Sequence, residues 1–406
     1  MKTNRILMGV LMLTAFMLLA SCGSSGAGAT GGGIGGSGII SRGAISEFGS
    51  IVVNGTEFET SAAIVMVNGE KVGTGDAAVQ RYLAEGQVVT VKGAIGESEE
   101  SAVAERVIYR SEVEGPISSV SGSSPDERQL HVMGQTVMVH YVTHLHDVVL
   151  EDIAPNMVVE VSGFYDDQGT VWATFLKVKG TYEADTIYEV KGFVEALDDL
   201  QKIFQINGLN VSYASADLRG LPDGVLENGM LVGATGKVDA AFTLMSADQV
   251  ALEDELEAEN AQEVEVTGFV TSKAAVDEFS VGSQVVVVED GAVFVDGVQD
   301  DVAPGVKLEA EGELVDGILW AYEIEFWAPD QFEIEGVVTQ IELINLDTGE
   351  AEFTVDDEKV VATTAQTAYE DGDLADIDLG VEVEIKGRMQ GGVMEADKVS
   401  FELEDN

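Results

Sequence analysis

The sequence has one cysteine and four histidines among 406 residues, and only 21 basic side chains against 73 acidic ones. The single cysteine, Cys22, leaves no partner for an intramolecular disulfide, so packing alone must stabilise the fold. The sequence also lacks the G-x-S-x-G, P-loop, H-E-x-x-H and C-x-x-C patterns that mark common catalytic and metal sites. We therefore expect a protein that is not an enzyme.

The shortage of basic residues gives the chain a formal net charge of −52 at pH 7. A field of this sign repels phosphate groups, so we expect no nucleic acid among the partners. It attracts cations and basic partners, although solubility in a salty habitat is the simpler explanation of the charge. Hydrophobic residues make up 45% of the chain, which argues against disorder.

The long apolar run of the sequence lies at its amino terminus. Lys2 and Arg5 precede an apolar stretch over residues 6–19, and Ala20-Ser21-Cys22 follows. A charged start, a short apolar core and small residues before a cleavage site predict a secretory signal peptide over residues 1–21. This stretch is too short to span a bilayer stably.

The ending Leu19-Ala20-Ser21-Cys22 resembles a bacterial lipobox, in which the chain is cut before the cysteine and the thiol is acylated. The resemblance implies lipidation of Cys22 and anchoring in the bacterial envelope, and Gly23 after it implies the outer membrane. Residues 22–38 would then form a Gly/Ser-rich tether with a reach of ~20–25 Å. An ordinary secretory signal with an incidental cysteine is the alternative.

From residue 39 onward the sequence repeats five times. Each copy has an apolar strand with a glycine, a hairpin, a less regular segment, a second glycine-containing strand and a last strand. We place the copies at residues 39–111, 112–183, 184–260, 261–330 and 331–406. The clearest boundary is the acidic stretch Glu253–Glu263, where the strand pattern lapses.

Five strands in this order predict one small OB-like β-barrel for each copy. The predicted hairpin turns are Asn54-Gly55, Gly134-Gln135, Asn207-Gly208, Gly282-Ser283 and Asp356-Asp357. Residue pairs of the Asn-Gly type favour such turns because both positions need positive φ. We expect an all-β fold of five tandem barrels, and small antiparallel sandwiches are the alternative.

The first copy also carries a family resemblance. Arg42-Gly43-Ala44-Ile45 and the stretch from Phe48 to Asn54-Gly55, with the later Val-x-Val-x-Gly strands, resemble domain of unknown function 5666. That family is seen as tandem repeats in secreted bacterial proteins, often lipoproteins. The resemblance implies an architecture and brings no established activity.

The histidines supply the sharpest chemical signal, because all four lie within 16 residues. If the turn is Gly134-Gln135, His131 opposes Met138 and His140 lies one diagonal step away on the outer face, within reach of one metal ion. The candidate ligands for Zn²⁺ or Cu²⁺ are His131, His140, His144, His146 and Asp147. Exposed histidines with no ligand are the alternative.

Two groups of aspartates suggest a weaker calcium hypothesis. Asp371, Asp373, Asp376 and Asp378 form one group, and Asp296, Asp300 and Asp301 form the other. Neither has the glycine and terminal glutamate spacing of an EF-hand. Such runs also arise by chance in a chain with 73 acids. No other cofactor is expected.

These observations favour an exported, envelope-anchored lipoprotein that acts as a binding, adhesion or spacer module. Its partner would be a protein, a polysaccharide or a cation. Four aromatic residues could line a binding face: Phe164, Trp172, Trp320 and Trp327. We expect them more readily in barrel cores or in contacts between repeats. A metal-binding envelope protein is the second hypothesis, and an envelope hydrolase is the third.

Overall fold

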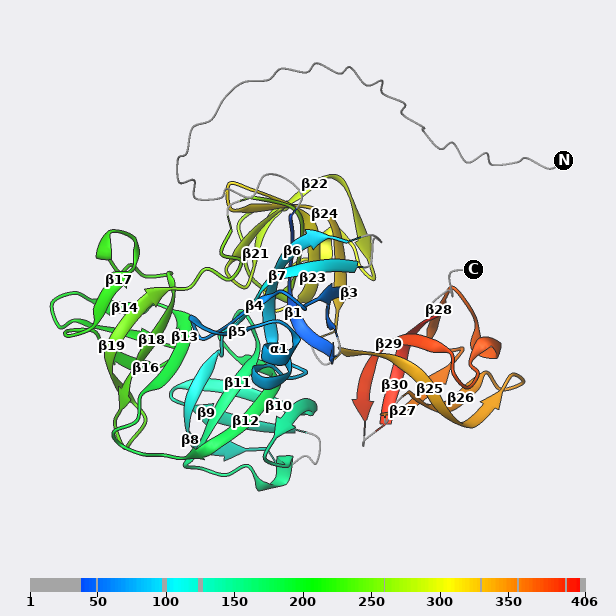
Figure 1. The fold of residues 1–406 in the computed structure, drawn as a ribbon, viewed down its shortest axis with the longest axis horizontal. Helices are drawn as coiled ribbons and strands as arrows, with labels where there is room; N and C mark the ends of the chain where they lie inside the picture. The colour runs from blue at the N-terminus through cyan, green and yellow to red at the C-terminus, as the bar shows by residue number, and fades with distance from the viewer. Residues whose placement is uncertain are drawn as a thin grey trace, which may run out of the picture. The chain divides into compact units, whose positions relative to one another are not determined.

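The structure is a computed structural model that describes residues 38–48, 50–96, 101–122, 127–258, 260–328, 331–355, 358–390 and 393–401. The expected signal peptide, Cys22, nearly all of the tether and the Asp356-Asp357 turn lie outside the described residues. Strands dominate the ribbon (Figure 1). No helix in the described ranges is both long enough and apolar enough to cross a membrane.

The first two repeats are built from strands and one short helix. Repeat 1 holds β1 (Gly38–Phe48), β2 (Ile51–Val53), β3 (Thr56–Glu59), β4 (Ile64–Val67), β5 (Glu70–Thr74), α1 (Asp76–Tyr82), β6 (Val88–Ile95) and β7 (Ser101–Tyr109). Repeat 2 holds β8 (Val113–Ser121), β9 (Glu127–Val132), β10 (Gln135–His146), the 3₁₀ turn η1 (Leu150–Asp152), β11 (Met157–Tyr165) and β12 (Val171–Thr181).

The remaining repeats follow the same order. Repeat 3 holds β13 (Tyr188–Phe193), β14 (Glu195–Asp198), β15 (Ile203–Ile206), β16 (Leu209–Ser212), β17 (Asp217–Gly220), η2 (Pro222–Gly224), β18 (Leu231–Val238) and β19 (Leu244–Leu252). Repeat 4 holds β20 (Ala261–Lys273), β21 (Glu278–Val281), β22 (Gln284–Val295), η3 (Gln299–Asp301), β23 (Lys307–Val315) and β24 (Ile318–Trp327). Repeat 5 holds β25 (Gln331–Asn345), β26 (Glu350–Val355), β27 (Glu358–Thr363), β28 (Ala368–Glu370), η4 (Leu374–Asp376), β29 (Glu382–Gln390) and β30 (Val393–Phe401).

Strand pairing closes each repeat into a barrel, as repeat 4 shows most simply. β20 pairs antiparallel with β21, and β21 pairs with β22. β22 runs parallel to β24, which pairs with β23, and β23 returns to β20. Numbered within the repeat, this order is 1-2-3-5-4-1, with the parallel pair between strands 3 and 5. The order is that of an OB-type barrel, so the predicted fold is confirmed.

The same closed order occurs in repeats 1, 2 and 5. It runs β1-β2-β3-β7-β6-β1 in the first, β8-β9-β10-β12-β11-β8 in the second and β25-β26-β27-β30-β29-β25 in the fifth. In repeat 1 the third strand is interrupted, because β3 and β4 lie one after the other along β7. In repeat 3, β14 follows β13 almost directly and carries the pairing to β15.

The fourth strand of every barrel has a glycine, and the same close backbone contact explains it in each case. A register shift marks a β-bulge at each of these positions, where the carbonyl of the fifth strand comes close. A Cβ atom there would lie 2.0–2.4 Å from that carbonyl oxygen. The glycines are Gly93, Gly163, Gly236, Gly312 and Gly387. Only glycine allows this approach, which explains why the pattern recurs.

One predicted turn is wrong by one residue. The hairpin between β9 and β10 turns at Met133-Gly134, both with positive φ, and not at Gly134-Gln135. Glycine therefore takes the second turn position, as it does in Asn54-Gly55 and Asn207-Gly208. The buried side chain of Met133 fills the space beside Gly115. Moving the turn by one residue keeps the same side chains facing inward, so the apolar pattern could not distinguish the two registers.

Pairs of barrels share sheets and cores. β1 of repeat 1 runs parallel to β20 of repeat 4, and β8 of repeat 2 pairs antiparallel with β13 of repeat 3. One continuous hydrophobic core extends through repeats 2 and 3. A smaller cluster joins Val88 of repeat 1, Phe164 of repeat 2 and Phe269 of repeat 4, with Trp172 packed against it. Phe164 and Trp172 thus belong to an inter-repeat contact.

Candidate functional site

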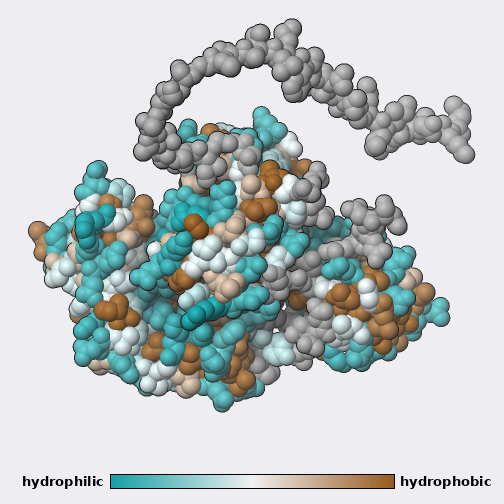
Figure 2. Space-filling model, in the orientation of Figure 1, coloured by the Kyte–Doolittle hydropathy of each residue, from teal (hydrophilic) through white to brown (hydrophobic). Residues whose placement is uncertain are grey.

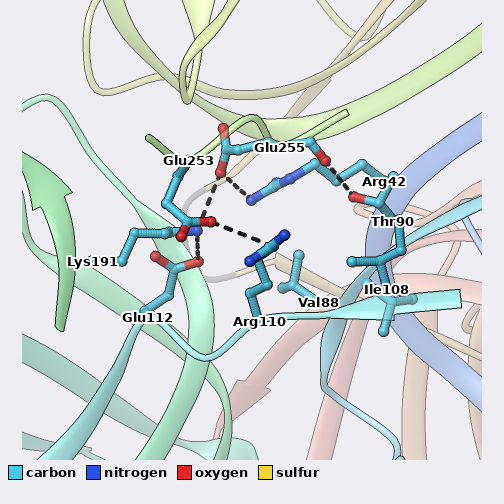
Figure 3. A pocket seen from close by; sticks show the side chains of 10 residues that line it. Arg42, Val88, Thr90, Ile108, Arg110, Glu112, Lys191, Glu253 and Glu255 are labelled. Carbon is cyan, nitrogen blue, oxygen red and sulfur yellow. Dashed lines mark hydrogen bonds and ion pairs between the residues drawn. The ribbon is translucent and has the colours of Figure 1, made fainter. Parts of the chain in front are cut away.

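Charged side chains from several repeats meet around a small hollow of about 20 Å³, which has room for about one water molecule (Figure 3). Its lining comes from strands of repeats 1 and 3, from the start of repeat 2 and from the segment that connects β19 to β20. The lining residues are Arg42, Val88, Val89, Thr90, Ile108, Arg110, Glu112, Lys191, Glu253 and Glu255.

Two cations reach this point from equivalent places in different barrels. Arg42 in β1 directly precedes Gly43, and Lys191 in β13 directly precedes Gly192. Each lies in the first strand of its repeat, one residue before the glycine of the sequence pattern. Both side chains point toward the carboxylate of Glu255 (Figure 3).

The two cations and two carboxylates form what we term the ion-pair junction, consisting of Arg42, Glu112, Lys191 and Glu255. Arg42 pairs with Glu255, and the Lys191 Nζ atom lies 2.6 Å from Glu112 Oε1 and 3.4 Å from Glu255 Oε1. All four side chains are at most 8% exposed. A buried pair of this kind is strongly destabilising to break, because an uncompensated charge remains behind.

Groups from repeats 2 and 4 make further hydrogen bonds to Glu255. Its Oε2 atom accepts hydrogen bonds from the backbone N–H of Ser283 at 3.0 Å and from the Ser283 hydroxyl at 2.8 Å. The hydroxyl of Tyr165 lies 3.4 Å from the same oxygen. Glu255 thus contacts groups from each of the first four repeats.

Burial disfavours the charged form of each group in the junction, and neighbouring opposite charges counter this effect. Burial alone would raise the pKa of Glu255, but Arg42 and Lys191 outweigh it and lower that pKa to about 2. Burial raises the pKa of Glu112, against the opposing effect of Lys191. For Lys191, burial works against the charged form, but Glu112 and Glu255 more than offset it and raise the pKa.

We term residues 253–257 the acidic connector. The side chains of its alternate residues, Glu253, Glu255 and Glu257, pair with arginines of repeat 1. Glu253 lies 3.4 Å from Arg110 Nε, and Glu257 lies 2.7 Å from Arg110 Nη2. Thr90 donates to the carbonyl of Glu255 at 2.7 Å. The stretch that the sequence marks as a boundary is therefore also a contact segment, and sequence reasoning missed this role.

The predicted histidine cluster does not assemble. In the observed register His131 lies opposite Thr136, not Met138, and His140 lies opposite Glu127. The two histidines are therefore four residues apart along the hairpin, or roughly 13 Å at strand spacing. No group of three or more His, Cys, Asp or Glu residues in the described ranges is placed to hold a metal ion.

The histidines instead make separate contacts. The ring of His140 stacks on Trp172 with centroids 5.4 Å apart, and His146 lies 5.1 Å from the ring of Phe175. His144 Nδ1 lies 3.9 Å from Glu85 of repeat 1, and partial desolvation of its half-exposed side chain lowers the pKa of His144. Asp147 is exposed and has positive φ.

Three aspartates of the calcium hypothesis, Asp301, Asp373 and Asp376, accept hydrogen bonds from the backbone. Asp373 accepts from the N–H of Ala375 and its own N–H donates to Asp376, which caps η4. Asp301 accepts from the N–H of Val298 in the same way before η3. These bonds give the carboxylates a local structural use.

A larger hollow of about 490 Å³ lies on repeat 1, beside the first hairpin. Its lining combines two carboxylates and two serines with a few apolar residues, and the Ser50 hydroxyl donates to Glu57. The lining residues are Ser50, Glu57, Glu59, Ile95, Gly96, Ser101, Ala102 and Val103.

Closed five-stranded barrels joined by a buried ion-pair junction define a tandem-repeat β-protein of OB type. The chain belongs to the family described as Domain of unknown function (DUF5666), whose model matches residues 37–108, 114–177, 267–325 and 335–400. Repeat 3 is not among the matched regions, although its strands close in the same order. The family description assigns no activity.

Two solved structures are similar to parts of this chain at low sequence identity. A full-length MCM homolog from Methanopyrus kandleri matches with 20% identity and a TM-score of 0.13, covering 19% of this chain and 16% of that protein. The Drosophila Unr CSD456 structure matches with 17% identity and a TM-score of 0.13, covering 54% of this chain and 99% of that one. The strand order 1-2-3-5-4-1 of the barrels defines the fold. The comparison with curated proteins found no match.

Proposed function

We propose that this chain is a non-enzymatic, exported lipoprotein that holds its first four barrels as one rigid body on the bacterial envelope. The observation that carries the proposal is Glu255, a single buried carboxylate with contacts to groups from each of the first four repeats. The hollow beside it has room for about one water, so the cluster suits mechanical support better than catalysis.

Rigidity distinguishes a spacer or adhesion module from a string of independent domains. Flexible linkers let neighbouring domains move separately, and interfaces that are small and polar leave such motion possible. Here the acidic connector is bonded on both sides by buried or half-buried cations. The body would stand off the membrane on the Gly/Ser-rich tether and present its outer strand faces to a partner.

Metabolic labelling tests the anchor. Cells that express the full chain are fed a fatty acid with a terminal alkyne, beside cells that express Cys22→Ser. We expect label on the parent and none on the variant, with the parent in the detergent phase and the variant in the aqueous phase. An unlabelled, water-soluble parent would overturn the envelope-anchored part of the proposal.

A further inference from the structure

The outer face of repeat 4 places glutamates directly opposite one another on three neighbouring strands. Glu265 of β20 pairs with Glu311 of β23, which pairs with Glu323 of β24. Glu309 pairs with Glu325 in the next row. Carboxylates directly opposed across strands repel one another once they are ionised, so a cation placed among them is favoured on this face, which we term the acidic face.

A lysine from another repeat already binds the acidic face. Lys386 of repeat 5 places its Nζ atom 2.6 Å from Glu325 Oε1 and 4.4 Å from the centroid of the Trp327 ring. Its side chain is only 9% exposed. Lys307 lies over the same ring at 4.9 Å. One carboxylate and one indole thus hold an ammonium group by ion pairing and cation–π attraction together.

The same combination of groups recurs farther along β24, facing solvent. Trp320 lies opposite the exposed Glu313, and the hydroxyl of Tyr322 donates to Glu311. Trp320 and Tyr322 are each 40% exposed. Hydrophilic and hydrophobic residues are interspersed on the face of the molecule seen in Figure 2. Two exposed aromatic rings directly beside carboxylates offer a cation both an ion pair and a cation–π contact.

We propose that Trp320, Tyr322, Glu311 and Glu313 bind an extended, lysine-bearing segment of a partner protein. Each ammonium group would lie between a carboxylate and an aromatic ring, as Lys386 does beside Glu325. Trp320 and Tyr322 are two residues apart in one strand, a separation of about 6.6 Å. Alternate side chains of an extended segment have the same spacing, so the motif recognised is Lys-x-Lys.

Charge complementarity favours a basic protein over a second copy of this chain. The chain has 21 basic residues and a net charge of −52, so two copies repel each other. The same field would accelerate the approach of a basic partner, and this acceleration falls as salt rises. The inference is independent of the lipid anchor and of the ion-pair junction.

Calorimetric titration of the full chain with a Lys-Thr-Lys-Thr-Lys peptide tests the proposal. We expect binding that Trp320→Ala and Glu313→Gln each weaken at least tenfold, with partial recovery in Trp320→Phe. Tyr82→Ala, a similarly exposed aromatic in repeat 1, is the matched control and should bind like the parent. Circular dichroism melting confirms that each variant is folded.

A peptide with acetylated lysines and an oligomer of glucosamine serve as competing probes. The proposal expects neither to bind as well as the lysine peptide. Equal binding of the acetylated peptide would overturn it, as would equal affinity of the parent and Trp320→Ala. Binding of the glucosamine oligomer in place of the peptide would also overturn it and assign the face to a cationic polysaccharide.

Discussion

Arg42 and Lys191 occupy the same position in two different repeats, and both pair with the carboxylate of Glu255. Arg42 is separated from Glu255 by 213 residues in the sequence and Lys191 by 64. The repeat unit therefore places a cation at the same strand position twice, and the acidic connector supplies Glu255 as the carboxylate that both cations share. The equivalent strand positions of repeats 1 and 3 thus both contribute to the contact between barrels.

Replacing Lys191 by methionine should destabilise the protein by about 3–5 kcal/mol, because Glu112 and Glu255 would remain buried without this cation. The measurement is urea unfolding followed by circular dichroism. Lys237→Met is the matched control, since Lys237 pairs with the exposed Asp185 at the surface of repeat 3. Exposed pairs are weak, so a control loss as large as that of Lys191→Met would contradict the account.

Stability should fall as the pH rises from 5 to 8.5. Burial and neighbouring carboxylates raise the pKa of Glu189 and Glu265 to about 7 and that of Glu309 to about 8. A folded-state pKa above the unfolded value of 4.5 means that the folded chain binds more protons, so deprotonation through pH 7–8 removes stability. Glu255 has the opposite effect, because its pKa in the folded state is lowered to about 2. Its contribution to the stability of the fold is lost only as the pH falls below 4.5 toward 2.

Urea unfolding at pH 5.0 and pH 8.5 measures this dependence at constant ionic strength. Glu309→Gln should reduce the difference between the two conditions, because glutamine cannot ionise beside Glu265 and Glu325. A parent protein that is as stable at pH 8.5 as at pH 5.0 would contradict the assignment.

The bulge glycines should be intolerant of a methyl group. In Gly163→Ala the new Cβ atom would lie 2.1 Å from the carbonyl oxygen of Trp172, so the two strands must separate. Gly55→Ala is the control, because Gly55 has positive φ but its new methyl group would meet no atom within 4 Å. We expect about 1–2 kcal/mol for the control, the cost of an L-residue at positive φ, and a clearly larger loss for Gly163→Ala in thermal melts.

The separation of the histidines predicts no shared metal site. Added Zn²⁺ or Cu²⁺ should shift the melting temperature of the parent and of a His131→Ala/His140→Ala variant by the same small amount. A ligand that binds only the folded state must raise this temperature. A rise seen in the parent and absent from the double variant would restore the metal hypothesis.

The barrels could be predicted from the sequence because their determinants are local. Alternating apolar residues, Asn54-Gly55 and Asn207-Gly208 set the hairpins, and the bulge glycines recur in every copy. The turn at Met133-Gly134 was missed because a period of two residues does not distinguish the registers. That error alone placed His131 and His140 together.

The ion-pair junction could not be predicted because its partners lie far apart in the sequence. Nothing near Arg42 indicates that Glu255 will contact it. Two signals were nevertheless present in the sequence. Cations occupy the position before the first-strand glycine in repeats 1 and 3, and glutamates alternate at positions 253, 255 and 257 of a stretch with no strand pattern.

Scanning calorimetry of the parent and of Glu255→Ala tests the central claim, that one buried carboxylate unites four barrels. Glu227→Ala, an exposed glutamate in repeat 3, is the control. We predict one cooperative transition for repeats 1–4 in the parent and control, and two or more transitions at lower temperature in Glu255→Ala. Separate transitions already present in the parent, or a transition that Glu255→Ala leaves unchanged, would contradict the claim.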